Sequence, residues 1–406
     1  CKLVIIQALL RKDIEGMSYF HVNTGILFSS KICVITAYVL TMLFFGCGGS
    51  SGSDATDTTN ISVIPPPPEP IPDPINVKPF PSGIYESAAA MRNPETDIVA
   101  NTPRSPGQVG VLVKVNWNLC GEDLECLFDT IQLNLDSAAS LGLQVGLGVT
   151  DGDNLPQSIK DACTIFEFEF RGEPASMCLP WDQQYIAAKV ALITQLAQRF
   201  DQHPALSYVY FTGACSTNGL EGHCRIDQQA FTKVGYTQEV LSASYLSIMN
   251  AYVEHFTVTP IVFEAHAIFD QPNLWEAVWA EVASTGKVGV AAWWCAERLS
   301  LNGRETATIW PLIQAIATET FAICQTVASF SSEPYRFSDS TLNLDYGEQT
   351  DWHENDTQAA FQETFDWLQG VTVHAGQAEP IVAFTTVEMW SQDLKNEAFT
   401  SRLANF

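Results

Sequence analysis

Short apolar runs alternate with longer stretches of helical periodicity from residue 109 to the C-terminus. In residues 124–141, for example, Leu127, Ile131 and Leu135 recur at the spacing of one helix face. The pattern predicts helices at 124–141, 182–200, 238–255, 273–284, 306–319 and 355–369. It predicts strands at 83–86, 109–117, 143–150, 206–213, 258–265, 287–294, 321–328 and 381–390.

Strands that are apolar on both faces and alternate with helices indicate a parallel sheet. Eight such strands favour an α/β fold of the (β/α)8 TIM barrel type, forming a single domain over residues 83–406. A doubly wound open sheet is the alternative. Against it, residues 118–123 read NLCGED after the strand that ends at Trp117, and no glycine-rich phosphate turn is present there.

The N-terminal region carries the pattern of an export signal. An apolar run at 32–45 follows Lys31 and ends in Gly46 and Cys47, and a Gly/Ser/Asp/Thr tract comes next. The run is shorter than the roughly 20 residues of a membrane span and has the size of a signal-peptide core. Residues 48–82 continue as a polar and then Pro-rich segment, which predicts a flexible and then semi-rigid tether.

This arrangement resembles a bacterial lipoprotein signal. The resemblance implies a signal peptide at 17–46 and a lipidated Cys47 that opens a linker over 47–82, while 1–16, ahead of the first methionine, are expected to lie upstream. Lipid would anchor the protein to the membrane. Because Gly48 rather than Asp follows the cysteine, the resemblance implies the outer membrane of a bacterial envelope. The family prefers Leu where Phe44 stands, and an uncleaved anchor helix is the alternative.

The net charge of the chain limits the classes of partner that it can bind. The formal net charge is −26, so the electrostatic field of the protein repels polyanions and argues against nucleic-acid binding.

Eight cysteines lie in the predicted barrel domain, residues 83–406. An even number of cysteines in an exported domain favours disulfides. Short local loops would pair Cys120–Cys126, Cys163–Cys178 and Cys215–Cys224, leaving Cys295–Cys324, although other connectivities stay open. No CxxC occurs and the histidines are scattered, so we expect neither a metal nor a cofactor.

Carboxylates, amides and indoles gather where the predicted strands end, which in a barrel is the mouth. Candidate ligand-binding residues at these ends are Trp117, Asn118, Glu264, His266, Trp294, Gln325 and Trp390, and candidate catalytic carboxylates are Glu221 and Glu388. Indole rings cover the apolar faces of sugars, and carboxylates accept hydrogen bonds from sugar hydroxyls. Cleavage of a glycosidic bond needs one carboxylic acid and a second carboxylate. The mixture therefore predicts a carbohydrate partner.

The chain resembles barrel glycosidases of the β-galactosidase and cellulase superfamily in three stretches. These are GVLVKVNW, FDTIQLNLDSAASLGLQVGLGVTDGDNLP and PWDQQYIAAKVALITQLAQRFDQHPALSYVYFTG, and Glu221 follows the last of them. The resemblance covers most of residues 107–395 and implies a glycoside hydrolase with Glu221 as general acid/base. The family's nucleophile is a glutamate at the end of the seventh strand, where this chain has Gln325. Glu388 or Glu297 would then supply the second carboxylate. A non-catalytic carbohydrate-binding lipoprotein on the same barrel is the alternative.

Overall fold

The computed structural model describes residues 77–87, 91–102, 104–170, 172–213, 226–269, 271–295, 308–326, 328–337, 356–369 and 384–406, together with 215, 220, 222 and 224. All of them belong to the compact unit Pro70–Phe406. The signal-like segment, Cys47 and most of the Pro-rich tether lie outside these residues. Within the described ranges, no helix combines the length and apolar character that a bilayer crossing requires.

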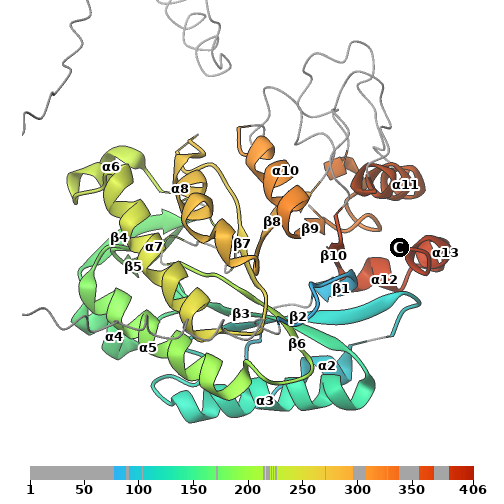
Figure 1. The fold of residues 1–406 in the computed structure, drawn as a ribbon, viewed down its shortest axis with the longest axis horizontal. Coiled ribbons are helices and arrows are strands. Elements are labelled where there is room, and N and C mark those ends of the chain that lie inside the picture. The colour runs from blue at the N-terminus through green and yellow to red at the C-terminus, as the bar shows by residue number, and fades with distance from the viewer. Residues whose placement is uncertain are drawn as a thin grey trace, which may run out of the picture. The chain divides into compact units, whose positions relative to one another are not determined.

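Eight parallel strands close into a barrel, which confirms the predicted fold class (Figure 1). Their order around the barrel is β1-β10-β9-β8-β7-β6-β3-β2. The strands are β1 (Gly83–Ser87), β2 (Gln108–Asn116), β3 (Gln144–Thr150), β6 (Leu206–Tyr210), β7 (Ile261–Glu264), β8 (Val288–Cys295), β9 (Ala322–Thr326) and β10 (Thr386–Met389). An open doubly wound sheet is excluded because β1 pairs with both β2 and β10.

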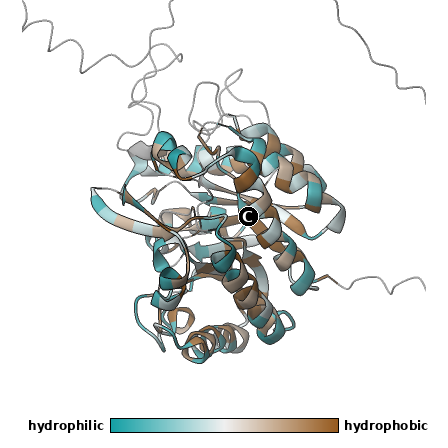
Figure 2. Ribbon diagram, turned by 90° about the vertical axis from the view of Figure 1, so that its left-hand side faces the viewer, coloured by the Kyte–Doolittle hydropathy of each residue, from teal (hydrophilic) through white to brown (hydrophobic). Residues whose placement is uncertain are grey.

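Helices cover the outside of the barrel and carry both hydrophobic and hydrophilic residues (Figures 1 and 2). The helices are α2 (Ile98–Asn101), α3 (Leu124–Leu141), α4 (Gln157–Ala162), α5 (Gln183–Phe200), α6 (Gln228–Lys233), α7 (Gln238–His255), α8 (Asn273–Val282), α10 (Trp310–Glu319), α11 (Thr357–Leu368), α12 (Ser391–Leu394) and α13 (Thr400–Leu403). Side chains of Asp123, Asp182 and Thr237 cap α3, α5 and α7 by accepting backbone N–H bonds. Gly142, with φ of 65°, ends α3 in the left-handed conformation.

An antiparallel hairpin, β4 (Ile165–Phe170) and β5 (Glu173–Cys178), is inserted between β3 and α5. The sequence analysis assigned no element to it. Its base is fixed to the core, because Met177 and Cys178 are fully buried and Cys178 is bonded to Cys163. The other disulfides are Cys120–Cys126 and Cys215–Cys224, which are local pairs that the spacing favours, and Cys295–Cys324, the pair that these leave.

The barrel interior holds its own cluster of buried side chains, separate from the layer between strands and helices. Tyr85, Leu112, Tyr208, Tyr210 and Trp293 belong to it. Glycine makes room for these large rings: a Cβ on Gly146 would lie 2.2 Å from the ring of Tyr208. Large side chains therefore fill the barrel interior around these positions.

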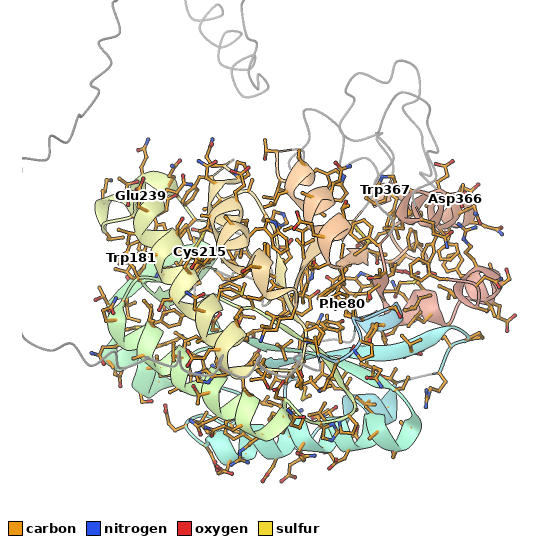
Figure 3. The ribbon with its side chains drawn as sticks, viewed as in Figure 1. Phe80, Trp181, Cys215, Glu239, Asp366 and Trp367 are labelled. Carbon is orange, nitrogen blue, oxygen red and sulfur yellow. A yellow bond between two sulfur atoms is a disulfide. The ribbon has the colours of Figure 1, made fainter. Side chains whose placement is uncertain are left out.

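The segment 77–82, which leads from the tether region into β1, lies against the N-terminal ends of the strands. The Lys78 ammonium donates to the carbonyl oxygens of His203 and Leu206, each at 2.9 Å, and to the Thr259 hydroxyl at 3.0 Å. Phe80 packs on Phe321 with ring centroids 4.9 Å apart, and Figure 3 shows Phe80 close to β1. The segment thus covers the barrel on the side opposite the mouth.

Candidate active site

Glu388 is the central ionisable group of the barrel interior. It lies on β10 with its side chain inside the barrel and is fully buried. Its Oε1 accepts hydrogen bonds from the hydroxyl groups of Tyr208, at 2.7 Å, and Tyr210, at 2.9 Å. Its Oε2 accepts a hydrogen bond from Gln325 Nε2 at 3.1 Å. Three neutral donors therefore surround the carboxyl group.

Burial raises the pKa of Glu388 to about 7, because the charged form loses its hydration. Hydrogen bonds from the two tyrosines and the positive charge of Lys114 act in the opposite direction and do not cancel this effect. The pKa values of Tyr208 and Tyr210 are raised well above their ordinary value, first by burial and then by the charge of Glu388. At neutral pH the phenols stay protonated, while Glu388 can exist with or without its proton.

Further polar groups extend this network around the barrel. Trp293 Nε1 on β8 donates to the Tyr210 hydroxyl at 3.2 Å. Gln325 Nε2 also donates to Ser87 Oγ at 3.0 Å, and Lys114 Nζ lies 3.3 Å from the same oxygen. The Lys114 ammonium lies 5.8 Å from the ring centroid of Trp293, within the range of a cation–π contact. Side chains from β1, β2, β6, β8, β9 and β10 therefore contribute to one connected polar layer.

Glu264, at the end of β7, is a second buried carboxylate. Its Oε1 lies 2.6 Å from His266 Nδ1 and accepts the Trp293 backbone N–H at 3.3 Å. Its Oε2 accepts the backbone N–H of Gly222 at 2.6 Å. A Cβ on Gly222 would lie 2.2 Å from the Glu264 carbonyl oxygen, so the loop approaches β7 at a distance that only glycine permits. Glu264 thus binds the loop after β6 to the barrel.

The remaining predicted residues fall into three groups. Trp390 follows β10 and is 43% exposed, so its ring is accessible to a ligand. Asn118 is exposed in the turn after β2. Trp117 is only 3% exposed and belongs to the main core, with Lys189 Nζ 5.4 Å from its ring centroid, so its ring faces are covered by protein. Glu221, Glu297 and the side chain of Trp294 lie outside the described residues.

The sequence analysis missed Tyr208 and Tyr210. A signal was present, because Tyr208 and Tyr210 alternate along LSYVY and must share one face of their strand. Polar or aromatic residues repeated at period two in an otherwise apolar barrel strand indicate the interior face. Among the described residues, no group of three or more His, Cys, Asp and Glu side chains could hold a metal ion.

No protein-family model and no curated protein matches the chain. The solved structures that it resembles include glycoside hydrolases. It resembles endo-glycoceramidase II from Rhodococcus sp. as a lactosyl-enzyme intermediate, with a TM-score of 0.43, 12% identity and coverage of 77% of this chain and 73% of that chain. For the complex of that enzyme with ganglioside GM3 the TM-score is 0.35 at 12% identity, over 60% of this chain and 66% of that one.

The catalytic domain of a Thermobifida fusca endoglucanase gives a TM-score of 0.30 at 9% identity, over 53% of this chain and 57% of that one. The chain thus spans less than two thirds of the endoglucanase domain. The barrel fold is assigned from the strand order of this chain. The similarities to these structures say nothing about its substrate or its chemistry.

Proposed function

We propose that this protein is a glycoside hydrolase that cleaves glycosidic bonds by carboxylate acid/base catalysis. The observation that carries the proposal is Glu388, a buried carboxyl group in the barrel interior whose pKa is raised to about 7. A general acid must hold a proton at the working pH and give it to the leaving oxygen. A carboxyl group with an ordinary pKa near 4.5 would be almost fully ionised at neutral pH, whereas Glu388 is not.

The second carboxylate is proposed to be Glu221, in the loop after β6. The support is indirect: its neighbour Gly222 is hydrogen-bonded to Glu264 at the end of β7, and its other neighbour, Leu220, is buried in the interior cluster. The roles differ from those implied by family resemblance, because the raised pKa suits Glu388 to the acid and leaves Glu221 as base or nucleophile. Trp390, which is exposed beside β10, is proposed to stack on a sugar ring.

The test is release of reducing ends from a panel of soluble polysaccharides by the wild-type protein, Glu388→Gln and Glu221→Gln. Glu281→Gln, an exposed substitution on α8, is the matched control. We expect both site variants to lose at least about a hundredfold in rate, the usual contribution of general acid/base catalysis, and the control to retain full activity. Unchanged rates in Glu388→Gln would refute the assignment.

A non-catalytic carbohydrate-binding function is the second candidate. Gln325 favours it, because an amide stands on β9 beside Glu388 and occupies one of its oxygens, and an amide cannot serve as a carboxylate nucleophile. Retention of the protein by a polysaccharide gel without any release of reducing ends would support this candidate and exclude hydrolysis.

Anchorage at the cell surface is a separate proposal based on the sequence around Cys47. We propose that a lipid on Cys47 holds the barrel at the outer membrane of a bacterial envelope. Incorporation of labelled palmitate into the wild-type chain, and its loss in Cys47→Ser, is the expected result. Equal labelling of both chains would contradict the assignment of the lipid to this cysteine.

A further inference from the structure

A groove separate from the barrel interior lies between the inserted hairpin and α6. It has a volume of about 350 Å³ and is lined by Phe166, Glu167, Phe168, Glu169, Ile226, Asp227 and Ala230. Ligand sites commonly have volumes of about 300–1,000 Å³, so the groove is large enough for one small unit of a ligand. Neither the sequence analysis nor the site described above uses any of these residues.

The lining combines flat apolar rings with carboxylates. The rings of Phe166 and Phe168 are nearly parallel, with centroids 6.2 Å apart, and Phe166 packs on Phe231 of α6 at 5.2 Å. The side chains of Glu167 and Glu169 are exposed, and their carboxylates have no hydrogen-bond partner in the described part of the chain. Successive residues of a strand point to opposite faces, so these carboxylates line the groove from the face of β4 that does not carry the two rings. Phe168 is the more accessible ring, because Phe166 is only 7% exposed. One apolar ring face together with carboxylate acceptors matches a pyranose, which has apolar faces and a rim of hydroxyl donors.

The groove is built on rigid elements. The hairpin is fixed at its base by the Cys163–Cys178 disulfide and by the buried Met177. Asp227 caps α6 through the Ala230 N–H at 2.6 Å, which holds that carboxylate at the edge of the groove. Trp181 and Tyr236 pack around Phe231 behind the groove, and Trp181 lies at the hairpin end of the domain in Figure 3. A site held this way binds without ordering a loop.

The position of the groove connects it with the barrel mouth. The hairpin follows β3, and α6 follows β6, so both sides of the groove come from segments that leave the C-terminal ends of barrel strands. β3 and β6 are neighbours in the barrel. In a barrel of this kind the segments after the strands surround the mouth. The groove therefore flanks the same face as Glu388 and Trp390.

We propose that this groove, called here the hairpin groove, binds one pyranose unit of a glycan whose reacting bond lies in the barrel mouth. The inference rests on the proposed function and specifies its substrate class: a polysaccharide or long oligosaccharide, rather than a disaccharide. A short glycan would occupy the mouth alone and gain nothing from the hairpin groove.

The test measures binding by affinity electrophoresis in gels containing β-glucan, xylan or galactomannan. Oligosaccharides of two to six units from the retained polymer then compete for binding. The variants are Phe168→Leu, which keeps apolar volume without a flat ring, and the double variant Glu167→Gln/Glu169→Gln. Glu173→Gln, on the same hairpin but outside the groove lining, is the control. Circular dichroism verifies the fold of each full-length variant.

We expect Phe168→Leu to weaken binding of the polymer and the six-unit oligosaccharide by roughly three- to tenfold, the usual contribution of one aromatic contact. Binding of the two-unit oligosaccharide should not change, and Glu173→Gln should behave as the wild type. If the groove variants bind long glycans more weakly and no protein shows turnover, hydrolysis is rejected and sugar binding in the hairpin groove is supported. If the protein cleaves a polymer that the groove variants bind as well as the wild type does, sugar binding in the hairpin groove is refuted and hydrolysis is not. Retention by none of the three gels would overturn both proposals.

Discussion

Glu388 should make the stability of the protein depend on pH in a way that one substitution removes. The folded-state pKa is about 7 and the ordinary value is 4.5. As the pH rises above 4.5, the unfolded chain releases the proton first, so the folded state loses stability. The loss continues until the folded carboxyl group ionises near pH 7. Stability from this group is therefore fully present below 4.5 and is lost across the window from 4.5 to about 7.

The magnitude follows from the difference between the two pKa values. One pKa unit corresponds to about 1.4 kcal/mol, so a carboxyl group with this shift costs the folded state about 3 kcal/mol above pH 7. At pH 5 the unfolded carboxyl group is already partly ionised, and the change expected between pH 5 and pH 8 is about 2 to 3 kcal/mol. Glu388→Gln has no proton to release and avoids this loss.

The assay is urea unfolding followed by tryptophan fluorescence at pH 5 and pH 8, for the wild type, Glu388→Gln and the exposed control Glu281→Gln. Other groups titrate in this range, so the quantity to compare is the difference in unfolding free energy between each variant and the wild type. For Glu388→Gln this difference should move by about 2 to 3 kcal/mol in favour of the variant at pH 8. For Glu281→Gln it should stay constant. A difference for Glu388→Gln that is the same at both pH values would refute the raised pKa.

Three further substitutions test other parts of the structure. Lys189→Met leaves the buried carboxylate of Asp151 without its partner at 3.0 Å, so unfolding free energy should fall by about 3–5 kcal/mol; a loss below about 1 kcal/mol in urea unfolding would show that the pair is not needed. Lys78→Met removes three hydrogen bonds that hold the segment across the barrel and should cost about 1–3 kcal/mol, measured as a lower urea midpoint; an unchanged midpoint would contradict this role. Replacing Cys163 and Cys178 by Ser removes a bridge with a sequence separation of 15 and should cost about 3 kcal/mol, with faster proteolysis of the hairpin; equal cleavage rates would count against a stabilising bridge.

The positions of α3 and α7 were predictable because local residues signal where these helices start. The predicted ranges 124–141 and 238–255 agree with α3 and α7 at both ends. The side chains of Asp123 and Thr237 cap these helices, and Gly142 ends the first one. These signals are local, so the chain specifies them without reference to the rest of the fold.

Strand ends were less predictable. The sequence predicts a strand at 206–213, whereas β6 ends at Tyr210. Phe211 still donates its N–H to Val262, so the chain continues beyond the strand without a regular ladder. Where pairing stops depends on the neighbouring strand rather than on local residues. The hairpin was not predicted although IFEFEF alternates at period two, because it interrupts the alternation of barrel strands and helices on which the predicted elements depend.

Long-range polar pairs could not be predicted from the sequence. Asp151 follows β3 in a stretch that reads as a turn, and Lys189 lies on the predicted helix face next to apolar residues. In the structure both are fully buried and form an ion pair, with the Tyr185 hydroxyl donating to Asp151 at 2.7 Å. Such a pair depends on the distance between a strand end and a helix, which no local pattern encodes. The same holds for the contact of Glu264 with Gly222.

Gln325, which stands where the resemblance places the family's nucleophile, and Glu388 are neighbours in the barrel interior. The two residues are register partners on adjacent parallel strands, and neighbouring strands lie about 4.8 Å apart. The Glu388 carboxyl group therefore lies one strand further round the barrel than Gln325, at the same level of the interior. The amide of Gln325 then orients the carboxyl group, because its Nε2 bonds both Glu388 and Ser87. A nucleophile must be ionised, whereas this environment raises the pKa of Glu388 and favours its protonated form. The arrangement thus suits Glu388 to donate a proton rather than to attack a sugar.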